Sequence, residues 1–245
     1  MEKFEWQVAR VKHIVQETPR AKTFTLALPQ WRPHLPGQHY DVRLTAEDGY
    51  QAQRSYSVAS PPAQAGEIEL TVDLIEDGEV SPYLHESVGI GDPLEVRGPI
   101  GGYFVWGSEL VELPLLLVAG GSGIVPLMAM LRHRAGIGAN YRTAVLYSAR
   151  SPEETIYREE LERIAQMPAQ GADVRFTFTR HSPPAWAGYR RRIDRAMLMD
   201  VLSGFAVQPQ CFICGPDALV EQVANTLVDL GLPADTIRTE RFGPG

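Results

Sequence analysis

The sequence predicts a two-part β + α/β chain: an N-terminal antiparallel six-stranded β-barrel, followed by an α/β part built on a parallel sheet. Two observations lead to this fold class. Up to Gly98 the chain holds short, often alternating apolar segments separated by Gly, Pro and Asp turns, which is typical of antiparallel strands. From Leu115 onward, apolar runs alternate with amphipathic helical segments, which is typical of a parallel sheet covered on both faces.

In the first part, strands are expected at residues 4–15, 21–29, 37–45, 49–60, 66–75 and 92–98. The one helical candidate there is the short segment 80–88. In the second part, strands are expected at 115–119, 142–149, 173–179 and 211–214, and helices at 123–134, 152–167, 193–202 and 216–231. We place the boundary within 105–114, which divides the chain into residues 1–106 and 107–245.

Composition excludes several classes of function. A formal net charge of -7 argues against non-specific binding to nucleic acid or to membranes, because both surfaces are anionic. No apolar run is long enough to span a bilayer, and the N-terminus has no apolar signal segment, so we expect a cytoplasmic protein. The six histidines show no metal-ligand spacing, so no metal site is predicted. We expect a monomer.

The only two cysteines, Cys211 and Cys214, are spaced as C-x-x-C, which raises the possibility of a redox dithiol. A redox pair of this kind normally opens a helix. Here the cysteines lie in an apolar run that ends at Gly215 and Pro216, which favours a buried strand. Two cysteines cannot supply the four thiolates of a plant-type iron–sulfur cluster, so any iron–sulfur partner must be another chain.

A glycine-rich turn, Gly120 to Gly123, lies between a buried strand and a helix that should begin near Pro126. Glycines permit a tight turn and the close approach of a ligand, and proline is tolerated in the first helical turn. The free N–H groups at a helix N-terminus suit a pyrophosphate. A purely structural turn is the alternative interpretation.

The strand segment Arg54 to Ser57 combines a cation, an aromatic ring and two hydroxyls. Alternation places Arg54 and Tyr56 on one face, with Ser55 and Ser57 on the other. A guanidinium binds phosphate oxygens, a tyrosine ring lies flat against a ring system, and Ser57 can hydrogen-bond that ring's edge. The combination favours a flavin nucleotide over a merely polar surface strand.

Together these motifs resemble the ferredoxin–NADP reductase superfamily over essentially the whole chain, in particular the single-chain reductases of oxygenase systems that lack a ferredoxin domain. The resemblance implies an FAD-binding domain at 1–106 and an NAD(P)-binding domain at 107–245. It implies FAD contacts at Arg54, Ser55, Tyr56, Ser57, Gly78, Val80, Ser81, Glu240 and Phe242, and dinucleotide contacts at Gly121, Ser122, Gly123, Pro126, Cys214, Gly215 and Pro216. FMN is the alternative flavin, disfavoured because Gly78 to Ser81 matches a phosphate-binding turn.

Basic residues favour NADPH over NADH, although NADH use stays possible. NAD-binding units usually carry an acidic residue after the second strand, but here that strand ends in Ser148 and Arg150. The third strand ends in Arg180, and Arg192 closes a basic run that could also be a solvated turn. A hydroxyl and arginines would bind the 2′-phosphate that distinguishes NADPH.

The resemblance implies that hydride passes from NADPH to FAD, and single electrons then pass to a ferredoxin or a similar iron–sulfur carrier. Ser57, Cys214 and Glu240 would align the nicotinamide against the flavin. Three alternatives remain: an NAD(P)H-dependent flavin or quinone reductase, an NADH-dependent reductase component of an oxygenase, and a binding module that no longer turns over.

Overall fold

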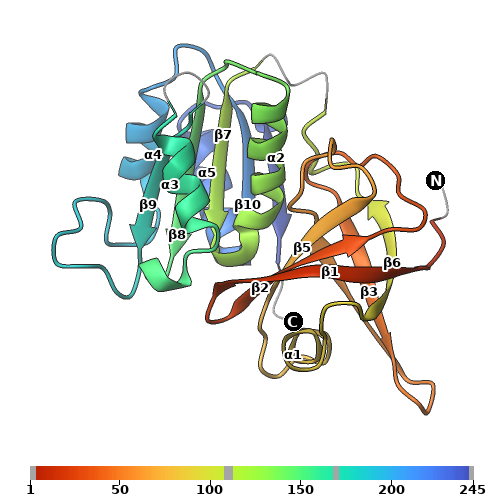
Figure 1. The fold of residues 1–245 in the computed structure, drawn as a ribbon. Helices are drawn as coiled ribbons and strands as arrows, with labels where there is room; N and C mark the ends of the chain where they lie inside the picture. Colours follow the sequence, from red (N-terminus) through yellow and green to blue (C-terminus); the bar gives the residue numbers. More distant parts are fainter. Residues whose placement is uncertain (1–3, 108–112, 168–170, 243–245) are drawn as a thin grey trace.

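The computed structural model describes residues 4–107, 113–167 and 171–242. It contains a six-stranded antiparallel sheet followed in the chain by a five-stranded parallel sheet, and the two lie side by side (Figure 1). The predicted fold class is confirmed. Among the described residues, no helix is long and apolar enough to cross a membrane.

The antiparallel sheet forms the N-terminal part. Its strands are β1 (Gln7–Thr18), β2 (Ala21–Ala27), β3 (His39–Thr45), β4 (Gln51–Ser57), β5 (Glu67–Asp73) and β6 (Pro93–Ile100), in the order β4-β3-β6-β1-β2-β5. A bridge between Val58, just after β4, and Leu70 in β5 joins the two edge strands and closes the sheet on itself. The short helix α1 (Val80–Glu86) lies near the predicted position. Most of β4 pairs only with β3, so its other edge is open.

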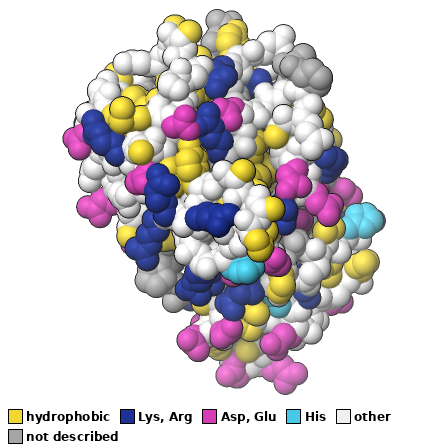
Figure 2. All heavy atoms as spheres, turned by 90° about the vertical axis from the view of Figure 1, so that its left-hand side faces the viewer, with side chains coloured by type: hydrophobic (Ala, Val, Ile, Leu, Met, Phe, Trp, Pro, Cys, Tyr) yellow, Lys and Arg dark blue, Asp and Glu magenta, His cyan; other side chains and the backbone are white. Residues whose placement is uncertain are grey.

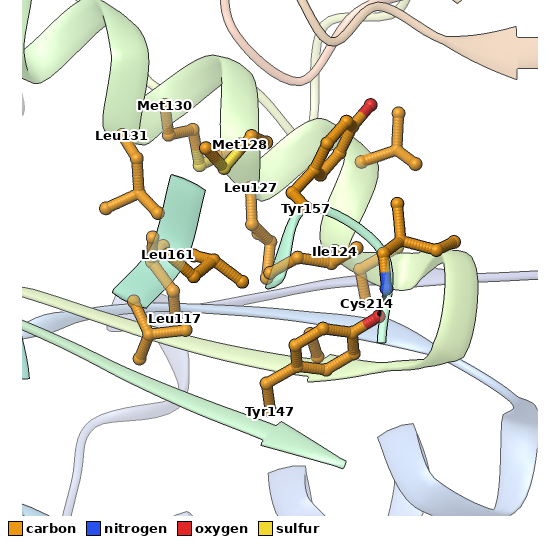
Figure 3. Close-up of a cluster of buried hydrophobic side chains, with 14 of the residues drawn as sticks. Leu117, Ile124, Leu127, Met128, Met130, Leu131, Tyr147, Tyr157, Leu161 and Cys214 are labelled. Carbon is orange, nitrogen blue, oxygen red and sulfur yellow. Dashed lines mark hydrogen bonds between the residues drawn. The ribbon is translucent and has the colours of Figure 1, made fainter. Parts of the chain in front are cut away.

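The parallel sheet carries helices on both faces. Its strands are β7 (Leu115–Gly120), β8 (Thr143–Ala149), β9 (Asp173–Phe178), β10 (Gln210–Gly215) and β11 (Ile237–Arg241), in the order β11-β10-β7-β8-β9. Helices α2 (Ile124–Gly136) and α3 (Arg158–Ala165) cover one face, and α4 (Arg195–Leu202) and α5 (Asp217–Asp229) cover the other. Leu117 packs under α2 and α3 (Figure 3), whereas Leu116 packs on the opposite side. Burial on both faces explains the uninterrupted apolar run of β7.

Two elements differ from the sequence prediction. The helix expected at 152–167 is divided into a 3-10 turn, Pro152–Glu154, and α3, which begins only at Arg158. Tyr157 between them has a left-handed backbone with φ of 58°, and both it and Ile156 are buried. The Ile156 N–H donates to the Tyr147 hydroxyl at 3.2 Å, so tertiary contacts override the helical pattern here. Strand β11 was not predicted.

The predicted domain boundary at 105–114 falls largely on residues 108–112, which lie outside the described residues. The two parts are joined through α2. Arg132 donates from Nη1 to the Ala59 carbonyl at 3.0 Å and to the Glu69 carboxylate at 2.7 Å, both in the barrel part. It also makes two hydrogen bonds to Glu160 of α3, at 2.9 and 2.6 Å. These contacts fix the barrel against the parallel sheet.

Candidate functional site

Two adjoining cavities lie where the carboxyl end of the parallel sheet faces the barrel. The larger encloses about 730 Å³ and the smaller about 340 Å³. Both are lined by residues of the barrel part and by residues of the parallel sheet. Four residues line both cavities: Asp73, Ile75, Ser122 and Phe242. A molecule in one cavity would therefore meet a molecule in the other at this shared wall.

The smaller cavity is lined by all nine residues predicted to bind FAD. These are Arg54, Ser55, Tyr56, Ser57, Gly78, Val80, Ser81, Glu240 and Phe242. The β4 segment reaches the cavity because it is an edge strand, whose outward backbone groups are not used by another strand. The cavity is also lined by His39, Thr71 and Val125, which the sequence did not single out.

Arg54 is exposed, and its Nη1 donates to the carbonyl of the adjacent Gln53 at 2.8 Å. Among the described residues no carboxylate forms a salt bridge with it, so most of its five N–H donors remain for an anion. Tyr56 packs against the barrel core, and burial raises the pKa of its hydroxyl. Ser57 is buried.

Ser55 differs from its neighbours because its hydroxyl already has a partner inside the barrel. It donates to Asp41 Oδ1 at 2.6 Å, and Arg97 binds the other oxygen of the same carboxylate at 2.7 Å. The Ser55 side chain therefore helps to order the strand, which leaves its backbone as the part that can serve a ligand.

The loop that precedes α1 is closed by hydrogen bonds within the cavity wall. The Ile75 N–H donates to Ser81 Oγ at 3.0 Å, and the Gly78 N–H donates to the Ile75 carbonyl at 2.9 Å. A Cβ at Gly78 would lie only 3.0 Å from that carbonyl oxygen, so glycine suits this turn. The structure thus gives the Ser81 hydroxyl a role in shaping the loop.

The glycine turn after β7 borders the larger cavity through Gly121 and Ser122. Gly121 has a φ of 55° and open space where a Cβ would stand, which permits the close approach of a ligand. Gly123 serves packing instead, because a Cβ there would lie 2.1 Å from the Cys214 carbonyl oxygen. Tyr147 holds the turn by donating to the Gly121 carbonyl at 3.0 Å. Helix α2 begins at Ile124, which lies within the predicted segment 123–134 and two residues before Pro126.

Gly123 and Pro126 do not line either cavity. Pro126 is buried in the first turn of α2, where it positions the helix. Their expected contribution to the site is thus confined to the shape of the turn and of the helix start.

The residues predicted to bind a 2′-phosphate gather in the larger cavity. Ser148 lies near the end of β8 and Arg150 directly follows that strand. Arg180 comes after β9, and Arg192 belongs to the loop before α4. Arg150 Nη1 lies 3.3 Å from the Glu154 carboxylate, in an exposed pair that a stronger anion can displace. Figure 2 views the molecule from the side on which β9 lies in Figure 1, and it shows Lys and Arg side chains grouped across the middle of that side.

The two cysteines lie on opposite faces of β10. Cys214 packs with Tyr147 and Ile124 (Figure 3), whereas Cys211 packs under α4 and α5. Both thiols are free and fully buried, and burial raises their pKa. This placement contradicts the alternative of a reactive dithiol.

Cys214 Sγ lies 4.0 Å from Glu240 Oε2, so the thiol is adjacent to the smaller cavity without lining it. Burial raises the pKa of Glu240 to about 7. Of the three consecutive residues Cys214, Gly215 and Pro216 that were predicted to contact the dinucleotide, only Pro216 lines the larger cavity. Gly215 approaches β7 closely, because a Cβ there would lie 3.0 Å from the Gly120 backbone.

Sequence reasoning missed the barrel residues that line the larger cavity: Thr18, Arg20, Asp73, Ile75 and Asp77. Burial raises the pKa of Asp73, and the charges of Arg20 and Arg150 oppose that shift. No motif marks Thr18 or Arg20. The acidic run that precedes Gly78 was a usable signal for Asp73 and Asp77, because it leads directly into a turn already assigned to the site.

Two domain families match the chain. The oxidoreductase FAD-binding domain family matches residues 8–105, and the oxidoreductase NAD-binding domain family matches residues 117–225. Among solved structures, a ferredoxin–NADP⁺ reductase from Neisseria gonorrhoeae with bound FAD and NADP superimposes with a TM-score of 0.80 at 20% identity, covering 98% of this chain and 99% of that one. This likeness establishes the fold.

Two relatives bear on identity. The reductase subunit of glycine betaine monooxygenase from Pseudomonas aeruginosa is 31% identical and covers 97% of this chain, but the chain spans only 64% of that relative's length. Ferredoxin–NADP reductase B from Sorangium cellulosum is 34% identical over 213 residues, which are 84% of each protein. The chain therefore belongs to the ferredoxin–NADP reductase family of flavoprotein oxidoreductases, with an FAD-binding domain followed by an NAD-binding domain.

Proposed function

We propose that this chain takes hydride from NADPH onto bound FAD and then passes single electrons to a protein acceptor. One observation carries the proposal: the cavity lined by the predicted FAD residues and the cavity lined by most of the predicted dinucleotide residues share a wall at Ser122 and Phe242. Hydride transfer requires two cofactors in contact, and this wall is where they would meet.

FAD fits the smaller cavity on the chemistry of its lining. Arg54 offers charge-assisted donors to the pyrophosphate, Tyr56 an aromatic surface, and the open edge of β4 free backbone groups. The loop from Ile75 to Ser81 closes the cavity beside them. When bound, FAD supplies the capacity to accept a hydride and to release electrons one at a time.

The dinucleotide fits the larger cavity in the same way. Gly121 and Ser122 leave room for a pyrophosphate at the start of α2. Arg150 and Arg180 supply positive charge just after β8 and β9, and Arg192 supplies it from the loop before α4, which supports a preference for NADPH.

Three residues are proposed to align the reacting rings. Ser57 would donate a hydrogen bond to the edge of the flavin, and Cys214 would support the nicotinamide from β10. Glu240, which lies beside the Cys214 thiol, would hold a proton near neutral pH because burial raises its pKa to about 7. Phe242 lies at the shared wall, where it would cover the flavin until the nicotinamide displaces it and exclude water meanwhile.

We also propose residues 1–106 and 107–245 as the FAD-binding and NAD(P)-binding domains, which the family matches to 8–105 and 117–225 support. The acceptor is proposed to be a ferredoxin or a similar iron–sulfur carrier, with the chain acting as a cytoplasmic monomer. Relatives named as oxygenase reductase components favour a second candidate, an NADH-dependent reductase that serves an oxygenase.

Stopped-flow spectroscopy of the purified flavoprotein tests the proposal. NADPH should bleach the flavin absorbance faster than NADH does, and the reduced protein should then reduce a ferredoxin faster than free flavin or a quinone. Absence of bleaching with either dinucleotide would reject the enzyme and favour a binding module. Faster turnover with free flavin would identify a flavin reductase.

A further inference from the structure

The turn between β1 and β2 reaches from the barrel into the larger cavity. Arg20 of this turn and Thr18, the last residue of β1, line the cavity together with Ser148 and Arg150 from the parallel-sheet part. Figure 1 shows the hairpin extending from the barrel toward the parallel sheet. A residue of the FAD-binding part therefore places a cation in the cavity assigned to the dinucleotide.

Arg20 is held in one position by both its backbone and its side chain. Its N–H donates to Thr18 Oγ1 at 3.2 Å, and its carbonyl accepts from the Leu74 N–H at 2.7 Å. The guanidinium donates to the Leu74 carbonyl and to Glu76 Oε1, each at 2.6 Å. Its side chain is still 37% exposed, and five N–H donors exceed these two bonds. The cation is thus pre-positioned with donors to spare.

The rest of the barrel wall is unfavourable to an anion. Asp73 and Asp77 line the same cavity, and Glu154 lines it from the sheet side. A dinucleotide pyrophosphate carries negative charge that these carboxylates would repel. Arg20 is the one cation that the described barrel residues contribute to this wall.

We propose that Arg20 is a dinucleotide-binding residue supplied by the barrel, whose guanidinium donates to the pyrophosphate of NAD(P)H. This inference rests on the proposed function. Glu76 holds the guanidinium in place through an exposed ion pair, which the ligand can compete with. The pyrophosphate is assigned rather than the 2′-phosphate, because Arg20 lines the cavity beside Asp73 and Ile75, which also border the flavin side.

Binding of NADP⁺ and NAD⁺ to the FAD-containing protein, measured by calorimetry, tests this assignment. Arg20→Ala should weaken both dinucleotides by a similar factor, about tenfold, since a charge-assisted hydrogen bond is lost in a partly solvated site. Arg20→Lys should weaken both less, because it keeps the charge. Glu76→Gln should leave affinity nearly unchanged, because the amide oxygen can still accept a hydrogen bond from the guanidinium, whose bond to the Leu74 carbonyl also remains.

Each contrary outcome overturns the inference in a recognisable way. Unchanged affinity in Arg20→Ala removes the contact, and a loss confined to NADP⁺ assigns Arg20 to the 2′-phosphate. Equal weakening in Glu76→Gln and Arg20→Ala shows that the ion pair only shapes the hairpin. Loss of FAD absorbance in Arg20→Ala assigns the residue to the flavin cavity. A wild-type protein that binds neither dinucleotide rejects the proposed function itself, whereas normal wild-type binding confines any failure to Arg20.

Discussion

At Arg54 the strand position decides what the side chain can do. The guanidinium lines the smaller cavity at the edge of the sheet. Within the described part of the chain, its one hydrogen bond is to the carbonyl of the neighbouring Gln53. Arg43, on the adjacent strand, instead makes two hydrogen bonds to Glu95, both at 3.0 Å. Two arginines of the same sheet thus differ in whether their donors are available to a ligand.

Arg54→Ala should leave the protein folded but largely colourless, because a charge-assisted bond to the flavin pyrophosphate is worth about 1.5–3 kcal/mol. Flavin absorbance relative to protein absorbance, with circular dichroism for folding, measures this. The matched control is Arg43→Ala, which should keep its flavin. A yellow Arg54→Ala protein at full FAD occupancy would remove Arg54 from the FAD site.

Glu240 makes stability depend on pH. Burial raises its pKa from 4.5 to about 7, so the folded state favours the protonated carboxyl. The contribution of the protonated carboxyl to the free energy of unfolding is complete below pH 4.5. It is lost as the pH rises to about 7, because in this range the carboxyl ionises more readily in the unfolded chain than in the folded protein. Relative to Glu240→Gln, the wild type should lose about 3 kcal/mol of unfolding free energy across this window. Urea titrations at matched FAD content measure it, and parallel pH profiles of the two proteins would contradict the burial argument.

At the scale of elements, local pattern predicts an element well where its own burial creates the pattern. The uninterrupted apolar run of β7 and the alternation of β5 are direct consequences of the faces that they bury. Strand β11 escaped prediction because it is an edge strand of which only Ile237 is buried. The break at Tyr157 escaped it as well, because the contacts that cause it come from Tyr147 on another strand.

The cavity-lining residues, like the elements, could be predicted where a short local motif marks them, but not where only the fold brings them to the cavity. The glycine turn, the β4 segment and the turn before α1 could be predicted because each is a short motif with its own chemistry. Arg20 could not, because it reaches the cavity only when the barrel packs against a sheet that begins at Leu115, almost a hundred residues later in the chain. Gly123 was identified from the sequence as part of the glycine-rich turn, but its close packing against β10 could be recognised only from the folded structure.

The ends of β8 and β9 bring Arg150 and Arg180 into one cavity, because the carboxyl ends of parallel strands share an edge. Replacing both arginines with alanine should raise the NADPH KM about tenfold or more, since each loses a charge-assisted bond to the 2′-phosphate. The NADH KM should be nearly unchanged. Arg163→Ala, an exposed arginine on α3 that lines neither cavity, is the control for lost charge. A wild-type kcat/KM that is higher for NADH than for NADPH would reject the preference.

At the scale of the whole molecule, the proposed function requires the barrel to be held firmly against the parallel sheet, since the two cavities share a wall. Arg132 and its partners Glu69 and Glu160 are largely buried at this junction, with exposed side-chain fractions of 19%, 24% and 27%. The Tyr157 hydroxyl also crosses it, to the hydroxyl of Thr71 in β5, a residue that lines the smaller cavity. One network therefore holds the barrel against the parallel sheet at the junction where the proposed cofactors would meet.

Arg132→Met should lower the free energy of unfolding by about 3 kcal/mol or more, because it leaves two carboxylates buried without their partner. Arg158→Met is the matched control, since its pair with Glu162 within α3 is 42% and 43% exposed and should contribute less than about 1 kcal/mol. Urea denaturation of both variants measures the difference. Because Arg132 lines neither cavity, its loss should slow flavin reduction more than it weakens dinucleotide binding. Equal destabilisation in the two variants, or a slowed reaction explained wholly by weaker binding, would show that the junction does not position the cofactors.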